Sequence, residues 1–179
     1  LAQPFLGAAV AALQSQSGLR FVIPYSGAES KACIEQALRQ SNIFIGEQFQ
    51  LIQNSQLAMT AADFIVMASG TATLEAMLLR KPMLVCYRLA PITYAIASRI
   101  VNVPHMALPN LLAGQRLVPE LVQDEVTVTA IRDEILRYFS DPADFEARLG
   151  EFEPLHRELR KDASTTAAAA IKGLLNLPN

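Results

Sequence analysis

Residues 62–76 have the sequence Ala62-Asp63-Phe64-Ile65-Val66-Met67-Ala68-Ser69-Gly70-Thr71-Ala72-Thr73-Leu74-Glu75-Ala76, the clearest structural pattern in the chain. Residues 64–67 are apolar without interruption, which predicts a buried strand. Residues 71–80 have the pattern of a helix, and only residues 68–70 lie between the two. A fully apolar strand that passes directly into a helix is typical of a parallel α/β sheet.

The same alternation of apolar runs and helical stretches extends through the first half of the chain. Strands are predicted at residues 20–24, 43–45, 64–67 and 83–86, and helices at residues 28–40, 55–62 and 71–80. Apolar strands that are separated by helices indicate a parallel sheet that is covered on both faces. We therefore expect an α/β fold, with a Rossmann-like parallel sheet that has helices on both faces.

A different pattern begins after residue 86, where prolines break the chain into shorter pieces. We expect a helix at residues 92–101, an extended piece at residues 105–108, and an apolar loop at residues 109–114 with a turn at Asn110. The chain is helical in pattern from Thr127 onward. This helical tail includes an Ala-rich helix that we place at residues 163–175.

These patterns divide the chain into two parts. We predict a Rossmann-like domain at residues 1–126 and a C-terminal helical segment at residues 127–179, which packs on the domain or on a partner. The chain opens with Leu1 inside a predicted helix, so we expect the domain to be truncated at its N-terminus.

Composition excludes several classes of protein. The chain has 179 residues, of which 51% are hydrophobic and 18% charged, so it is long and apolar enough to bury a core. Its net charge of −2 argues against nucleic-acid binding, which needs a basic surface. No run of about 18 apolar residues is present, so we expect no membrane-spanning helix and a soluble, cytoplasmic protein.

The residues that most often form metal sites and nucleophilic centres are sparse. Cys33 and Cys86 have no metal-ligand spacing, and Cys86 lies in an apolar run that predicts a buried free thiol. His105 and His156 are too far apart in sequence to indicate a zinc site. The chain has no P-loop, no GxGxxG and no GxSxG motif. We therefore predict no metal site.

Small polar residues follow the strand at residues 64–67. Ser69, Gly70 and Thr71 would expose backbone N–H groups at a helix N-terminus, outside the carboxyl end of a parallel strand, where anions are favoured and ligands usually bind. The hydroxyl groups of Ser69, Thr71 and Thr73 add donors. A phosphate or diphosphate suits this arrangement. The alternative is that the segment only turns the chain and caps the helix.

Three further residues are candidates for the same site. Glu75 could accept hydrogen bonds from the two hydroxyls of a ribose, or it could be a solvated acid in the first helical turn. Arg88 follows the strand at residues 83–86 and could clamp a phosphate, or it could form a surface salt bridge. Asn110 could donate to and accept from a nucleotide, or it could bond its own backbone in a turn.

Four segments together resemble the family of lipid-A-disaccharide synthases, glycosyltransferases of the GT-B architecture. They are residues 68–78 with Ser-Gly-Thr and Glu75, residues 82–88, residues 108–114 with Pro-Asn-Leu-Leu-Ala-Gly, and residues 117–124 with Pro-Glu-Leu. The first segment is similar to those of many nucleotide-sugar transferases. The Pro-Asn-Leu-Leu-Ala-Gly segment is much more particular to this family.

The resemblance implies that the chain is the C-terminal, UDP-sugar-binding half of such an enzyme. The family transfers 2,3-diacylglucosamine from its UDP form to 2,3-diacylglucosamine 1-phosphate, with inversion and without a metal or other cofactor. The catalytic residue is then expected in an N-terminal domain. The parent enzyme is expected at the cytoplasmic face of the inner membrane, as a peripheral protein. The nucleotide-binding residues implied are Ser69, Gly70, Thr71, Thr73, Glu75, Arg88 and Asn110.

Two other functions stay open at this stage. A UDP-sugar 2-epimerase-like isomerase shares the two-domain architecture and a similar Ser-Gly segment, but the Pro-Asn-Leu-Leu-Ala-Gly segment argues against it. A non-catalytic dimerisation module would use the helical tail, exchanged between two copies in a homodimer. If the chain is one half of a transferase, as the resemblance implies, we expect it to be inactive alone.

Overall fold

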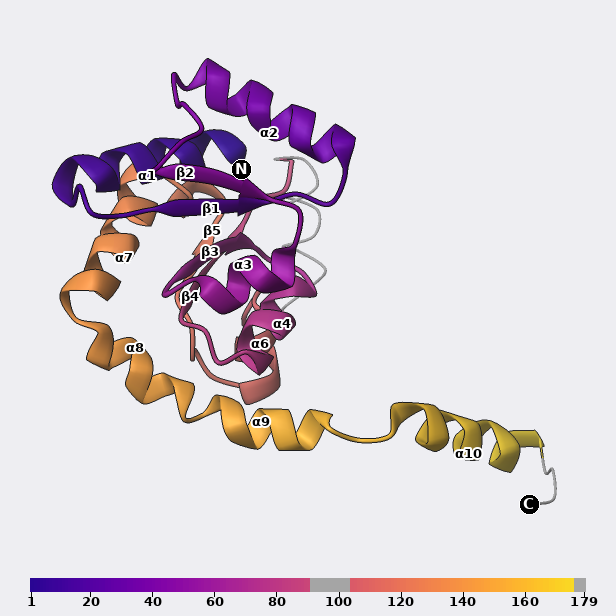
Figure 1. Cartoon of the computed structure of the whole chain (residues 1–179). Helices are drawn as coiled ribbons and strands as arrows, with labels where there is room; N and C mark the ends of the chain where they lie inside the picture. Colours follow the sequence, from indigo (N-terminus) through magenta and orange to yellow (C-terminus); the bar gives the residue numbers. More distant parts are fainter. Residues whose placement is uncertain (91–103, 176–179) are drawn as a thin grey trace.

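The computed structural model of the chain describes residues 1–90 and 104–175, in which strands and helices alternate (Figure 1). The strands are β1 (Phe21–Pro24), β2 (Phe49–Ile52), β3 (Ile65–Ala68), β4 (Met83–Tyr87) and β5 (Glu120–Val122). The helices are α1 (Ala2–Ser15), α2 (Ala28–Gln40), α3 (Ser55–Ala61), α4 (Ala72–Leu78), α6 (Leu108–Ala113), α7 (Val128–Ser140), α8 (Pro142–Leu149), α9 (Phe152–Leu159) and α10 (Ala163–Leu175), with a short 3₁₀ helix at Gln123–Glu125. The helix predicted at residues 92–101 lies outside the described residues.

The strand pairs are all parallel in the described part of the chain, as the apolar strand pattern predicted. β1 pairs with β2, and β3, β4 and β5 form a second sheet with β4 in the middle. Residues 83–86 of β4 are fully buried, which explains why this strand is apolar along its length. The predicted α/β, Rossmann-like class with helices on both faces is confirmed.

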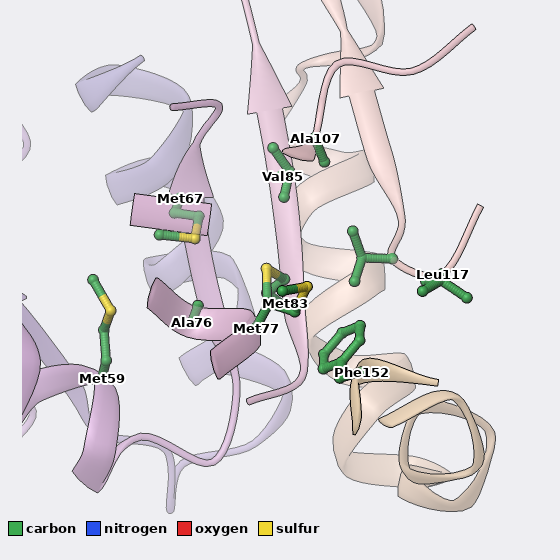
Figure 2. Packing of buried hydrophobic residues seen from close by; sticks show 10 residues of the cluster. Met59, Met67, Ala76, Met77, Met83, Val85, Ala107, Leu117 and Phe152 are labelled. Carbon is green, nitrogen blue, oxygen red and sulfur yellow. The ribbon is translucent and has the colours of Figure 1, made fainter. Parts of the chain in front are cut away.

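Alternate side chains of β4 point into two different cores. Leu84 and Cys86 pack with apolar residues of α1 and α7. Met83 and Val85 pack on the opposite face with residues of α3, α4 and α9, together with Ala107 and the segment before β5. Figure 2 shows this second core, with Phe152 of α9 close to Met83. The two cores place α4 and the residues around α6 on the same face of the sheet.

The strand predicted at residues 43–45 is wrong. Asn42 has a left-handed backbone (φ 54°), and the N–H of Ile43 donates to the carbonyl of Leu38 (2.9 Å). This is the usual way in which a helix ends with a left-handed residue followed by an apolar anchor, so Ile43 is buried as the end of α2. Phe44 is 86% exposed, and the second strand of the chain is instead Phe49–Ile52.

The loop predicted at residues 109–114 is a helix, α6, and Asn110 lies inside this helix rather than in a turn. Pro109 fits because the first helical turn needs no N–H donor at that position. Gly114 ends the helix with a left-handed backbone (φ 65°). The strand β5, which follows six residues later, was missed because it has only three residues.

The C-terminal helices differ in how far they pack on the sheet. Thr127 caps α7 by accepting a hydrogen bond from the N–H of Ala130 (3.1 Å), and α7 then packs along α1. Helix α9 contributes the fully buried Phe152 to the core beneath α4. Helix α10 extends away from the rest of the molecule, and residues 163–174 are exposed (Figure 1). The division at residue 126 stays a prediction.

The helices of the described residues include none that combines the length and the apolar composition needed to cross a bilayer.

The two cysteines lie in contrasting surroundings, which gives a direct test of the packing around β4. Cys86 is a buried free thiol, as predicted, and burial raises its pKa to about 12, whereas Cys33 is exposed. Since the thiolate is the reactive form, we expect iodoacetamide at about pH 8 to label Cys33 alone in the folded chain. The Cys33→Ser variant should remain unlabelled until urea unfolds it. Rapid labelling of this variant without denaturant would show that the β4 core is open.

Candidate functional site

The turn between β3 and α4 is closed by its own residues. The N–H of Ser69 donates to the carbonyl of Cys86 (2.9 Å) and so continues the pairing of β3 with β4. The carbonyl of Gly70 accepts from both the N–H (3.1 Å) and the hydroxyl (2.7 Å) of Thr73. Thr73 is completely buried. Its hydroxyl is therefore engaged in holding the turn, and its predicted contact with a nucleotide stays a prediction.

Three successive N–H groups at this turn have no acceptor in the part of the chain that the structure describes. Those of Gly70, Thr71 and Ala72 donate to no group within residues 1–90 and 104–175. Gly70 and Thr71 are exposed, and the space around the α-carbon of Gly70 is open to 4 Å in the direction of a Cβ. Consecutive free N–H groups on an exposed turn are a suitable binding site for phosphate oxygens.

Glu75 lies one turn further along α4. It is exposed, and its carboxylate forms no ion pair or side-chain hydrogen bond with the described residues. Both carboxylate oxygens are therefore free to accept hydrogen bonds from a ligand that reaches the turn. This is the property that the predicted contact with ribose hydroxyls requires.

Arg88 emerges at the same edge of the sheet, because Ala68 at the end of β3 is in register with Cys86 of β4. Its guanidinium donates to the carbonyls of Gln123 (3.2 Å) and Val126 (3.0 Å), beyond β5. Arg88 makes no salt bridge with a carboxylate of the described residues. Two of its five N–H donors are used in this way, and the other three have no partner among residues 1–90 and 104–175 and could donate to a phosphate.

Asn110 is placed differently from the other candidates. Its side chain is fully buried, and its amide oxygen accepts from the N–H groups of Leu117 (2.8 Å) and Val118 (2.9 Å). Its amide nitrogen donates to the carbonyl of Val118 (2.9 Å) and to the carboxylate of Glu120 (2.7 Å). All four bonding positions of the amide are thus occupied within the chain. Asn110 holds the segment before β5, and its direct contact with a nucleotide stays a prediction.

Glu120 also belongs to this region, although no sequence motif predicted a role for it. Its carboxylate accepts from the N–H groups of Met106 (3.0 Å) and Ala107 (2.9 Å), besides the amide of Asn110. The carbonyl of Met106 in turn accepts the hydroxyl of Ser69 (2.6 Å). Glu120 therefore connects Ser69 to α6 and β5. The available signal was a carboxylate within the otherwise apolar run of residues 117–122.

The Glu120→Gln variant tests this connection. A glutamine has one acceptor oxygen where the carboxylate has two, so its NH₂ group would face a backbone N–H and leave it unpaired. We expect a loss of about 1–3 kcal/mol in the free energy of unfolding, measured in urea. The control is Glu125→Gln, because Glu125 is exposed and accepts only from the N–H of Val122 (2.8 Å) on the same segment. Equal losses in the two variants would contradict a special role for Glu120.

The core beneath the site fixes α4 and α6 relative to each other. In Figure 2, Met67 of β3 and Met77 of α4 lie on this face of the sheet with Leu117 and Phe152. Ala107, directly before α6, lies beside Val85 of β4 in the same view. Ser69 and Glu120, which are connected through Met106, both lie next to this one packed core. The core therefore holds the turn between β3 and α4 in a fixed position.

Metal-binding groups are not clustered in this region. Among residues 1–90 and 104–175, no three His, Cys, Asp or Glu side chains lie close enough together to hold a metal ion. The candidate site consists of N–H groups, hydroxyls, a carboxylate and a guanidinium at the carboxyl ends of β3 and β4. Such groups recognise a ligand by its phosphates and hydroxyls.

A parallel sheet with helices on both faces and a polar strand-to-helix turn at its carboxyl edge defines a Rossmann-like ligand-binding domain. The protein-family comparison then narrows this class. The family model described as lipid-A-disaccharide synthetase matches residues 1–171, and the chain belongs to this family. The resemblance found in the four sequence segments is confirmed.

Curated relatives support the same family. The chain is 43% identical over 171 residues to a lipid-A-disaccharide synthase of Pseudomonas savastanoi pv. phaseolicola. The aligned region covers 96% of this chain and 43% of that protein. It is 42% identical over 176 residues to the lipid-A-disaccharide synthase of Cellvibrio japonicus, and the aligned region covers 98% of this chain and 45% of that protein. It is 40% identical over 177 residues to the lipid-A-disaccharide synthase of Xylella fastidiosa (strain M12), and the aligned region covers 98% of this chain and 46% of that protein. The chain spans about half the length of the curated relatives it matches.

Proposed function

We propose that this chain binds the UDP part of a UDP-sugar for a lipid-A-disaccharide synthase. The observation that carries this proposal is the exposed turn at Gly70 and Thr71, where three N–H groups have no acceptor among residues 1–90 and 104–175. The carboxylate of Glu75, which has no partner in the same part of the chain, lies one turn away. The N–H groups of Gly70, Thr71 and Ala72 and the hydroxyl of Thr71 bind the diphosphate, while the hydroxyl of Ser69 donates to the carbonyl of Met106 and holds the turn in place. Glu75 accepts from the ribose hydroxyls, and the free N–H donors of Arg88 bind a phosphate oxygen.

The reaction proposed for the whole protein is the transfer of 2,3-diacylglucosamine from its UDP form to 2,3-diacylglucosamine 1-phosphate, giving lipid A disaccharide and UDP. The role of this chain is to hold the leaving group. As the glycosidic bond to UDP breaks, negative charge grows on the diphosphate, and N–H groups fixed around it stabilise that charge. The family assignment favours this transfer over the epimerase reaction, which none of the observations on the described residues supports.

The proposal extends to partners and location. Helix α10 carries the exposed apolar residues Ile171 and Leu174 on a segment that projects from the sheet domain (Figure 1). Exposed apolar side chains on a projecting helix favour contact with another surface. They support a homodimer with exchanged C-terminal helices. We place the parent enzyme at the cytoplasmic face of the inner membrane, as a peripheral protein whose lipid substrates lie in that membrane.

Calorimetric titration with UDP tests the site. We expect the chain to bind UDP and the Glu75→Ala variant to bind it roughly tenfold more weakly, because hydrogen bonds to a charged acceptor are worth about 1.5–3 kcal/mol. Glu29→Ala is the matched control, since Glu29 is also exposed and also lies in the first turn of a helix, α2. Equal UDP affinity in all three proteins would remove Glu75 from the site. Absence of UDP binding by the unmodified chain would refute the proposed function.

A further inference from the structure

Gln123 directly follows β5, at the same end of the sheet as Arg88. Its backbone is left-handed (φ 52°), a conformation that is unfavourable for residues other than glycine. This turn leads the main chain from β5 into the 3₁₀ helix at Gln123–Glu125, so the backbone pairing of β4 with β5 ends at Tyr87 and Val122. A left-handed glutamine persists only where its surroundings hold it in that conformation.

The side chain of Gln123 continues the pairing that its backbone ends. Its amide oxygen accepts from the N–H of Leu89 (2.7 Å), and its amide nitrogen donates to the carbonyl of Leu89 (3.2 Å). Leu89 lies two residues beyond Tyr87, the last residue of β4 that pairs with β5. A carboxamide offers a donor and an acceptor side by side, as a neighbouring strand does. The backbone that follows Arg88 is therefore fixed by Gln123.

The main chain of Gln123 holds the other end of the Arg88 side chain. The Gln123 carbonyl accepts from Nε of Arg88 (3.2 Å), and a terminal nitrogen of Arg88 donates to the carbonyl of Val126 (3.0 Å). The N–H of Val126 donates to the same Gln123 carbonyl (3.2 Å). One residue thus fixes both the backbone beside Arg88 and its guanidinium, although Arg88 is exposed. Simple capping of β5 would need the contacts to Leu89 but not those to the guanidinium.

We propose that Gln123 is a positioning residue, which holds the Arg88 guanidinium ready for a phosphate of the UDP-sugar. This role rests on the proposed function, which supplies the phosphate. The register of β3 with β4 places Arg88 at the same edge of the sheet as the turn at residues 69–71. An exposed arginine loses rotamer freedom when it binds a ligand, and an arginine that is already held loses less. Gln123 thereby strengthens diphosphate binding without contacting the ligand.

Calorimetric titrations with UDP test the coupling between Gln123 and Arg88. Glycine adopts a left-handed backbone without strain, so Gln123→Gly removes the amide and keeps the turn. We expect this variant to bind UDP roughly fivefold more weakly than the unmodified chain, and Arg88→Ala roughly tenfold more weakly. The double variant should bind no more weakly than Arg88→Ala, because Gln123 acts only through Arg88. Gln115→Gly is the matched control, since Gln115 is an exposed glutamine without a side-chain hydrogen bond to the described residues.

Hydrogen exchange at Nε of Arg88, followed by ¹⁵N NMR without ligand, tests the positioning separately from the proposed function. We expect this N–H to exchange several-fold faster in Gln123→Gly, because a turn that is no longer tied to Leu89 holds its carbonyl less firmly. If the unmodified chain does not bind UDP, the proposed function fails, and these exchange rates then decide whether Gln123 positions Arg88. Urea midpoints of the two proteins should be similar, since relief of the left-handed strain offsets the lost amide bonds.

Each of four results would overturn the proposal. Equal UDP affinity of Gln123→Gly and the unmodified chain would show that the amide does not contribute to binding. Unchanged affinity in Arg88→Ala would remove the guanidinium from the site. A loss on Gln123→Gly that persists in the Arg88→Ala background would show that Gln123 acts through the fold and not through Arg88. Equal exchange rates at Nε of Arg88 in the unmodified chain and Gln123→Gly would show that Gln123 does not hold the guanidinium.

Discussion

We expect the Asn110→Ala variant to lose about 3 kcal/mol of its free energy of unfolding. The substitution removes an amide whose oxygen accepts from two buried N–H groups, those of Leu117 and Val118. Each buried donor that is left without a partner costs about 1–3 kcal/mol. The carboxylate of Glu120 loses its shortest hydrogen bond at the same time (2.7 Å). Urea unfolding followed by circular dichroism measures the loss.

Asn54→Ala is the control for this variant. Asn54 is an exposed asparagine that caps α3 by accepting from the N–H of Leu57 (2.8 Å). Its removal should cost about 1 kcal/mol, as for other helix caps. A loss at Asn110 no greater than that at Asn54 would mean that the network around β5 does not stabilise the fold. The function of the Asn110 side chain would then be to bind a ligand and not to stabilise the fold.

We also expect a large loss in the free energy of unfolding for the Phe152→Ala variant. Phe152 is 1% exposed and lies at the start of α9, packed against the core beneath α4 (Figure 2). Removing a buried aromatic ring usually costs about 3–5 kcal/mol, because apolar burial is lost and a cavity is left. We expect a loss in this range, accompanied by faster hydrogen exchange throughout α9, which would lose its only fully buried side chain in the described structure.

Phe44→Ala provides the comparison, since Phe44 is 86% exposed and should be close to neutral. The pair of variants tests where the C-terminal segment packs. A large effect at Phe152 means that the segment up to α9 is part of the sheet domain in the isolated chain. A loss below about 1 kcal/mol would mean that α9 is docked weakly and that its proper partner is another surface.

Local patterns predicted much of the fold. The helices at residues 28–40 and 163–175 have the predicted bounds, and β4 extends one residue beyond the prediction. These elements are determined by periodicity and apolar runs within the segment itself. The strand expected at residues 43–45 failed because an apolar triplet can equally anchor the end of a helix. Only the packing of Ile43 beneath α2 separates the two possibilities.

The candidate site was predictable where a single segment forms it. The order strand, Ser-Gly-Thr, helix places N–H groups at the sheet edge whatever surrounds it. By contrast, the connection from Ser69 through Met106 to Glu120 joins residues far apart in sequence. No local pattern could indicate it. The sequence also could not reveal that Asn110 is buried, because this follows from the helical form of residues 108–113, their packing against α4 and α9, and the hydrogen bonds of Asn110 to residues 117–120.

We propose above that the turn after β3 binds the diphosphate of UDP. The most direct test of this proposal is an NMR titration of the ¹⁵N-labelled chain with UDP into the millimolar range. We predict that the amide signals of Gly70, Thr71 and Ala72 shift most and saturate together, because their N–H groups have no acceptor in the described part of the chain and would bind the phosphate oxygens. Saturable shifts centred elsewhere, with these three signals unmoved, would contradict it.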